Sequence, residues 1–107
     1  MIVGIGCDVV SVNRCRAPLA NRILSPSELE RYASLQGCRQ QEFLAGRFAI
    51  KEALIKALEK PLPMADMDIQ YEHQKPVIHL PGLIIHLSIS HEKEIAIGFA
   101  VVERDMI

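Results

Sequence analysis

The chain has 107 residues, half of them hydrophobic and none tryptophan, so its core must be built mainly from aliphatic side chains. The formal net charge of −1 gives no support for a nucleic-acid-binding domain, which is normally clearly basic. The apolar runs are too short to cross a bilayer and no signal-peptide pattern is found, so we expect a soluble cytoplasmic protein without a membrane partner.

At this length we expect a single domain over residues 1–107, for which oligomerisation would be a natural source of further burial. The cysteines Cys7, Cys15 and Cys38 lack regular spacing, which argues against a disulfide framework and fits a reducing compartment. Cys7 lies in an apolar run, and we expect it to be buried.

The first predicted element is a strand over Met1–Val12, in which one carboxylate, Asp8, interrupts an apolar run. Because side chains alternate along a strand, Asp8 shares a face with Gly4 and Gly6. Glycines on that face leave room for a neighbouring backbone or a ligand, or they mark a β-bulge.

A short or broken helix is expected over Asn13–Leu24, because proline interrupts the pattern there. The next segment begins a helix more clearly, with Ser25 as N-cap, Pro26 in the first helical position and Glu28 completing a capping box. Gly37 is a candidate for the end of that helix.

A longer helix is predicted over Gln40–Glu59 and is closed by prolines that follow it. Glu52 and Lys56 lie one turn apart on one face, and Arg47 and Lys51 form the adjacent row. Taken alone, Glu52 and Lys56 could be an ordinary exposed ion pair.

Asp8 and Glu52 together suggest a different interpretation, a divalent metal site with lysines beside it for phosphate. Mg²⁺ typically binds one or two carboxylates and fills its other positions with water and phosphate oxygens. Two acids well separated in sequence meet that requirement.

The rest of the chain is predicted to be sheet. Met67–Tyr71 and Pro76–Leu80 form one expected hairpin, and Leu83–Ser90 and Ile95–Val102 form a second one. We therefore expect an α+β fold with an antiparallel sheet packed against helices. His91 falls in the second predicted turn, where it could meet an anionic ligand or simply face solvent.

Three blocks of this sequence resemble the holo-[acyl-carrier-protein] synthase family, the short single-repeat type of phosphopantetheinyl transferase. They are G-I-G-x-D at Gly4–Asp8, E-F-L-A-G-R-F-A-x-K-E-A-x-x-K-A at Glu42–Ala57, and H-L-S-I-S-H at His86–His91. The resemblance implies transfer of phosphopantetheine from coenzyme A to a serine of an acyl carrier protein.

The resemblance also implies roles for individual residues. Asp8 and Glu52 match the Mg²⁺ ligands and, with Lys56, are the expected catalytic residues. The expected contacts with coenzyme A are Arg47, Lys51, Lys56 and His91. The expected contact with the carrier protein is Arg14.

Relatives of this size are homotrimers with the site at a subunit interface, which is the assembly the resemblance implies here. The chain departs from the family pattern after the long helix, where Leu58–Pro63 contains prolines instead of a glycine loop. Prolines lack the backbone N–H that could approach phosphate. An alternative function is therefore a non-catalytic coenzyme A or nucleotide-binding module of the same fold.

Overall fold

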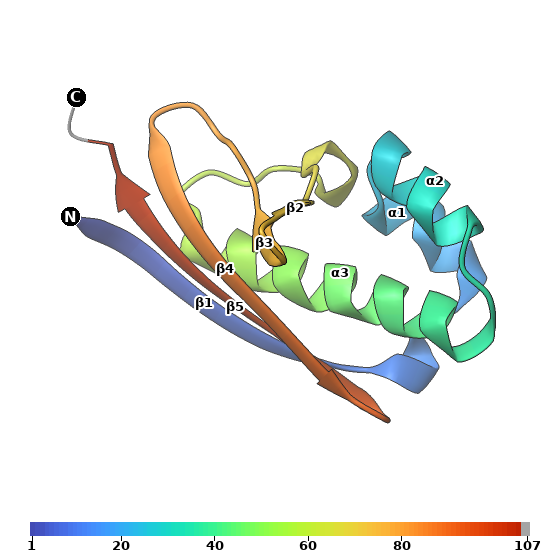
Figure 1. Ribbon diagram of the computed structural model, residues 1–107. Coiled ribbons are helices and arrows are strands. Elements are labelled where there is room, and N and C mark those ends of the chain that lie inside the picture. Colours follow the sequence, from blue (N-terminus) through green and yellow to red (C-terminus); the bar gives the residue numbers. More distant parts are fainter. Residues whose placement is uncertain (106–107) are drawn as a thin grey trace.

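The computed structural model describes residues 1–105, which form a sheet with helices packed on one of its faces (Figure 1). The sheet has the strand order β1-β5-β4, with β1 at Ile2–Ser11, β4 at Leu83–Glu92 and β5 at Ile95–Arg104. Both strand pairs are antiparallel, and the long helix α3, Gly37–Ala57, lies across the sheet. The predicted α+β architecture is confirmed.

The strands β4 and β5 form a tight hairpin. Glu92 pairs with Ile95, so only Lys93 and Glu94 separate the strands. His91 was predicted to lie in the turn, and that prediction is wrong, because His91 is inside β4 opposite Ala96. Its side chain is consequently fixed to one face of the sheet instead of projecting from a loop.

Glycines in β1 let the strand approach α3 closely. An added Cβ would lie 1.8 Å from the carbonyl oxygen of Ala57 at Gly4, and 1.9 Å from that of Ala53 at Gly6. Neighbouring backbone fills the room beside both glycines, as one of the alternatives predicted, and the pairing of β1 with β5 also has a register irregularity between Ile2 and Gly4. This contact holds the first half of β1 against the end of α3, and Asp8 follows Gly6 by two residues on the same face of the strand.

The core is aliphatic, as the composition predicted. One cluster of buried side chains lies between α3 and the N-terminal helices. A second cluster lies between α3, the sheet and the segment that precedes β4. Leu44, Ile50 and Leu54 of α3 are fully buried between these layers. Among residues 1–105, no helix is long and apolar enough to cross a membrane.

The predicted broken helix is confirmed as three short pieces, η1 at Val12–Arg14, η2 at Ala17–Leu19 and α1 at Ala20–Ile23. Helix α2, Pro26–Ala33, begins with the predicted capping box. The Ser25 hydroxyl accepts a bond from the Glu28 amide at 3.3 Å, and the Glu28 carboxylate accepts one from the Ser25 amide at 2.9 Å.

Gly37 was expected to end this second helix, but α2 ends at Ala33. Gly37 instead begins α3, with a φ of +58° that favours glycine. The long helix therefore starts about one turn before the predicted Gln40.

A short hairpin crosses the helical side of the molecule. After the 3-10 turn η3, Met64–Asp66, the chain forms β2 at Gln70–Glu72 and β3 at Lys75–Val77. This hairpin is shorter than predicted, and it places Tyr71 beside Arg47, in the middle of α3.

The sheet face away from α3 is apolar and uncovered in the single chain. Phe99 of β5 is 44% exposed and pairs with Cys7 of β1, which is also exposed. The prediction that Cys7 is buried is therefore wrong for the isolated chain. Other exposed apolar residues on these strands include Ile5, Val9, Ile95 and Ile97.

Candidate functional site

Asp8 and Glu52 meet at one cavity, although they lie on different elements. Both residues line a cavity of about 340 Å³ between β1, η1 and α3. The strand contributes Asp8 and the helix contributes Glu52, which is half-buried. The close contact of β1 with α3 explains why residues so distant in sequence come together.

Lys56 lies next to this pair. Its Nζ donates to the Asp8 carboxylate at 3.0 Å and to the Cys7 carbonyl at 3.0 Å, and its side chain is 53% exposed. Since Lys56 also follows Glu52 by one helical turn, two carboxylates and one ammonium gather at this end of the site. The ammonium is available to an anion because half of its side chain faces solvent.

The donor set fits a hard dication that keeps most of its water. In the described part of the chain, no group of three or more His, Cys, Asp or Glu side chains could hold a metal ion. Asp8 and Glu52 thus supply two carboxylates, which is the number Mg²⁺ commonly takes when phosphate oxygens complete its shell. A site that needs several soft or nitrogen ligands, such as structural zinc, does not fit this pair.

Arg14 lies at the edge of the same cavity, at the end of η1, and is exposed. Arg16 and Arg22 are exposed farther along the same segment, and no acidic residue occurs between Asn13 and Ile23. The surface beside the candidate metal ligands is therefore locally basic, although the whole chain is nearly neutral.

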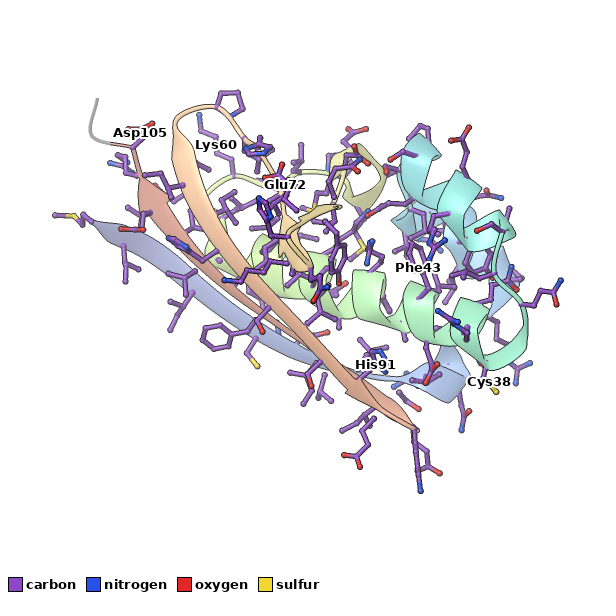
Figure 2. The ribbon with its side chains drawn as sticks, viewed as in Figure 1. Cys38, Phe43, Lys60, Glu72, His91 and Asp105 are labelled. Carbon is purple, nitrogen blue, oxygen red and sulfur yellow. The ribbon has the colours of Figure 1, made fainter. Side chains whose placement is uncertain are left out.

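A second and larger cavity, of about 640 Å³, lies between α2, the start of α3, β2 and β4. Figure 2 labels Phe43 and His91, which approach it from α3 and from the end of β4. His91 Nδ1 lies 3.8 Å from the Glu42 carboxylate. The remaining cationic side chains of the lining are Arg31, Arg39 and Arg47.

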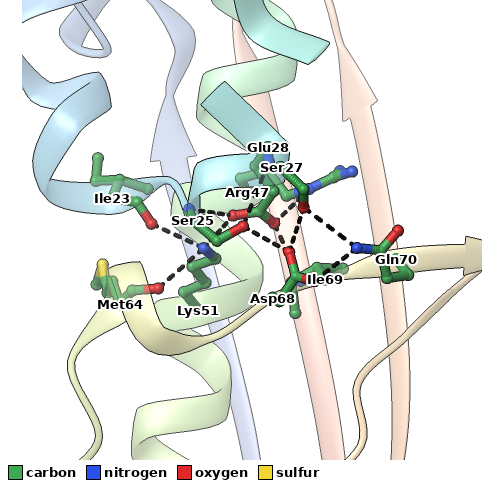
Figure 3. Close-up of polar contacts among 10 residues, drawn as sticks. All are labelled: Ile23, Ser25, Ser27, Glu28, Arg47, Lys51, Met64, Asp68, Ile69 and Gln70. Carbon is green, nitrogen blue, oxygen red and sulfur yellow. Dashed lines mark hydrogen bonds and ion pairs between the residues drawn. The ribbon is translucent and has the colours of Figure 1, made fainter. Parts of the chain in front are cut away.

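Lys51 was expected to contact coenzyme A, and the packing of this chain contradicts that expectation. Its side chain is 0% exposed, and its Nζ donates to the Ile23 carbonyl at 2.8 Å and the Met64 carbonyl at 3.0 Å. A third bond goes to the Glu28 carboxylate (Figure 3). All three donors of the ammonium are used inside the protein, so Lys51 stabilises the fold.

Burial lowers the pKa of the Lys51 ammonium, because desolvation penalises the charged form, and the bond to Glu28 opposes this shift. Asp68, close to this network, has a lowered pKa because the hydroxyls of Ser25 and Ser27 donate to its carboxylate. The pKa values of Lys51 and Asp68 therefore depend on contacts that form only when α2, α3 and the segment before β2 are packed together.

Glu28 is the residue that the sequence interpretation missed. It was predicted as a capping-box acid, but its carboxylate is buried and also accepts bonds from Arg47 Nε at 3.0 Å and the Ile69 amide at 3.2 Å. The signal for a cap is local, whereas the contacts with Arg47 and Lys51 connect two helices. Nothing in the spacing of residues 25–28 indicates them.

Comparison with known proteins adds to this geometry. A family model described as the 4'-phosphopantetheinyl transferase superfamily matches residues 4–100. The chain belongs to this superfamily. A holo-[acyl-carrier-protein] synthase of Geobacillus kaustophilus is 44% identical, covering 97% of this chain and 91% of the relative. One of Mycoplasma mycoides is 41% identical and covers 98% of both chains.

Among solved structures, a holo-(acyl-carrier-protein) synthase from Bacillus anthracis, in complex with CoA (3',5'-ADP), has a TM-score of 0.90. It is 38% identical, with 98% of this chain and 99% of the other covered. The predicted resemblance and the phosphopantetheinyl transferase fold are confirmed.

This transferase fold divides the candidate residues between the two edges of the sheet. Asp8 belongs to β1, and His91 belongs to β4, which are the outer strands of the order β1-β5-β4. Glu52 and Arg14 line the β1-side cavity, whereas Arg47 lines the cavity on the β4 side. A single chain thus presents two separate groups of polar side chains.

Proposed function

We propose that this chain transfers 4'-phosphopantetheine from coenzyme A to a serine of apo acyl carrier protein, in a reaction that requires Mg²⁺. The products are holo-acyl carrier protein and adenosine 3',5'-bisphosphate. The observation that carries the proposal is the meeting of Asp8 and Glu52 at one cavity, with Lys56 bonded to Asp8, in a member of this superfamily. We propose that residues 1–107 act as one domain in the cytoplasm.

The roles of the residues follow from the negative charge on the phosphate groups that react. Transfer of a phosphoryl-type group depends mainly on positioning and on charge stabilisation, and less on covalent chemistry. Asp8 and Glu52 would hold Mg²⁺, which supplies positive charge to pyrophosphate oxygens when bound. Lys56, half-exposed beside Asp8, places an ammonium where it offsets further negative charge.

The larger cavity suits the anionic coenzyme. Arg47 and His91, both expected coenzyme A contacts, line it together with two further arginines. Arginine presents a planar set of donors that matches phosphate, and a protonated histidine adds a donor with positive charge. We assign the phosphates of coenzyme A to this lining, in which the buried Lys51 takes no part.

The exposed basic segment after β1 suits the carrier protein. Arg14 lies at the edge of the cavity that contains Asp8 and Glu52, so a carrier held there would present its serine near these carboxylates. An acidic partner surface would be attracted by Arg14 and by the neighbouring exposed arginines. This placement supports the expected role of Arg14 in carrier-protein binding.

A homotrimer would bring the two groups of polar side chains together across a subunit boundary. They lie at opposite edges of one sheet, and the apolar face of that sheet is uncovered in the single chain. A large exposed apolar face is typical of a protein–protein contact. Packing of these faces would bury Phe99 and Cys7 and would set the β4 edge of one copy beside the β1 edge of the next.

Changing Phe99 to aspartate tests this assembly. A carboxylate in an apolar subunit contact is expected to lower the mass measured by light scattering at micromolar concentration from trimer to monomer, and to remove transfer activity. Lys60→Asp, an exposed change in the loop after α3, is the control and should stay trimeric and active. A monomeric but active wild-type protein would contradict the proposed assembly.

The transfer reaction is tested directly by incubating the protein with coenzyme A, Mg²⁺ and an apo acyl carrier protein. The carrier is expected to gain the mass of phosphopantetheine at its serine, read by mass spectrometry. The proline-containing loop Leu58–Pro63 favours the alternative, a non-catalytic coenzyme A-binding module. Binding of coenzyme A without any change in carrier mass would support that alternative and contradict transfer.

A further inference from the structure

The guanidinium of Arg47 is held between two aromatic rings and a carboxylate. Its central carbon lies 4.4 Å from the ring centroid of Phe43 and 5.0 Å from that of Tyr71. Its Nε donates to Glu28 at 3.0 Å (Figure 3). Within residues 1–105, the two terminal nitrogens of Arg47 make no hydrogen bond, although the side chain borders the larger cavity.

These contacts limit how the side chain can move. Arginine normally has many accessible rotamers, and ordering them on ligand binding costs free energy. The bond to Glu28 fixes Nε, and the rings restrict rotation of the guanidinium plane. The donors that remain for a ligand are therefore oriented before the ligand arrives, and preorganised contacts of this kind increase affinity.

We infer that Tyr71 is a positioning residue for coenzyme A binding, which acts by holding the Arg47 guanidinium toward the anion in the larger cavity. This inference rests on the proposed function, because it takes Arg47 to bind a phosphate of coenzyme A. Phe43 and Glu28 belong to α3 and α2, whereas Tyr71 comes from the β2–β3 hairpin. The hairpin thus contributes an aromatic ring to the site, next to Gln70, which also lines the cavity.

Tyr71 is also the member of this arrangement that can be changed with least effect on the fold. It is 49% exposed, and in the described part of the chain its hydroxyl makes no hydrogen bond. Its ring contact with Arg47 is therefore the interaction that a substitution removes. Changing Glu28 instead would disturb Lys51 and the Ile69 amide as well.

The test compares Tyr71→Leu with Tyr71→Phe. Leucine removes the aromatic face, so the apparent coenzyme A constant, measured by calorimetry and as KM in the transfer assay, should rise about three- to tenfold. The kcat should change little, because the metal ligands are in the other cavity. Phenylalanine keeps the ring face and should restore wild-type affinity.

The Arg47→Ala background shows whether the effect passes through Arg47. Arg47→Ala itself should weaken coenzyme A binding, and Tyr71→Leu should then have no further effect, as expected for coupled residues in a double-mutant cycle. Equal affinities for the leucine and phenylalanine variants would overturn the inference. A leucine effect that persists undiminished without Arg47 would also overturn it.

The proposed function has a separate readout. If wild-type protein adds phosphopantetheine to the carrier while Tyr71→Leu binds coenzyme A normally, the positioning role fails and the transferase assignment remains. If the carrier mass never changes but coenzyme A affinity follows the expected pattern, the positioning role is supported and the catalytic assignment fails.

Discussion

Replacement of either Asp8 or Glu52 by alanine is expected to abolish phosphopantetheine transfer, with a loss of activity of about a hundredfold or more. Both carboxylates line the same cavity, and two is the number that Mg²⁺ commonly uses, so either change removes half of the protein ligands. The fold should persist, because within residues 1–105 Asp8 is paired only with the half-exposed Lys56, and its loss leaves no buried charge alone.

The measurement is the rate at which the carrier gains mass, with circular dichroism as the check on folding. Glu59→Ala provides the matched control, because Glu59 is an exposed carboxylate whose side chain pairs with Arg104 outside either cavity. A chelator should abolish wild-type activity, and added Mg²⁺ or Mn²⁺ should restore it. Full activity in Asp8→Ala or in Glu52→Ala would refute the metal assignment.

Lys51→Ala is expected to destabilise the protein by about 3–5 kcal/mol, the range measured when one partner of a buried ion pair is removed. The change deprives Glu28 of an ammonium and leaves the carbonyls of Ile23 and Met64 without that donor. A domain of this size typically has only about 5–15 kcal/mol of stability, so this loss would be a large part of it. Urea unfolding followed by circular dichroism measures it.

Lys56→Ala is the matched control for stability, because it removes the other lysine of the same helix. Lys56 pairs with Asp8 near the surface, and such exposed pairs contribute only about 0–1 kcal/mol. The two lysines should therefore have opposite profiles, with Lys51 affecting unfolding and Lys56 affecting transfer. An unchanged urea midpoint for Lys51→Ala would show that the buried network contributes little to folding.

Several parts of the structure follow from local patterns in the sequence. The capping box at Ser25 and Glu28 depends on residues three apart, and the alternation along β1 depends on residues two apart. The same short-range rules placed Glu52 and Lys56 on one face of a long helix. These interactions lie within one element, so the sequence by itself determined them.

The tertiary structure decided which of these side chains solvent can reach. Lys51 and Lys56 are alike in the sequence pattern, but α2 and the segment before β2 cover Lys51, whereas Lys56 lies near the surface beside β1. The meeting of Asp8 with Glu52, like the contact of Tyr71 with Arg47, joins elements that are distant in the chain. Spacing within one element cannot fix such contacts, because they depend on how closely separate elements pack.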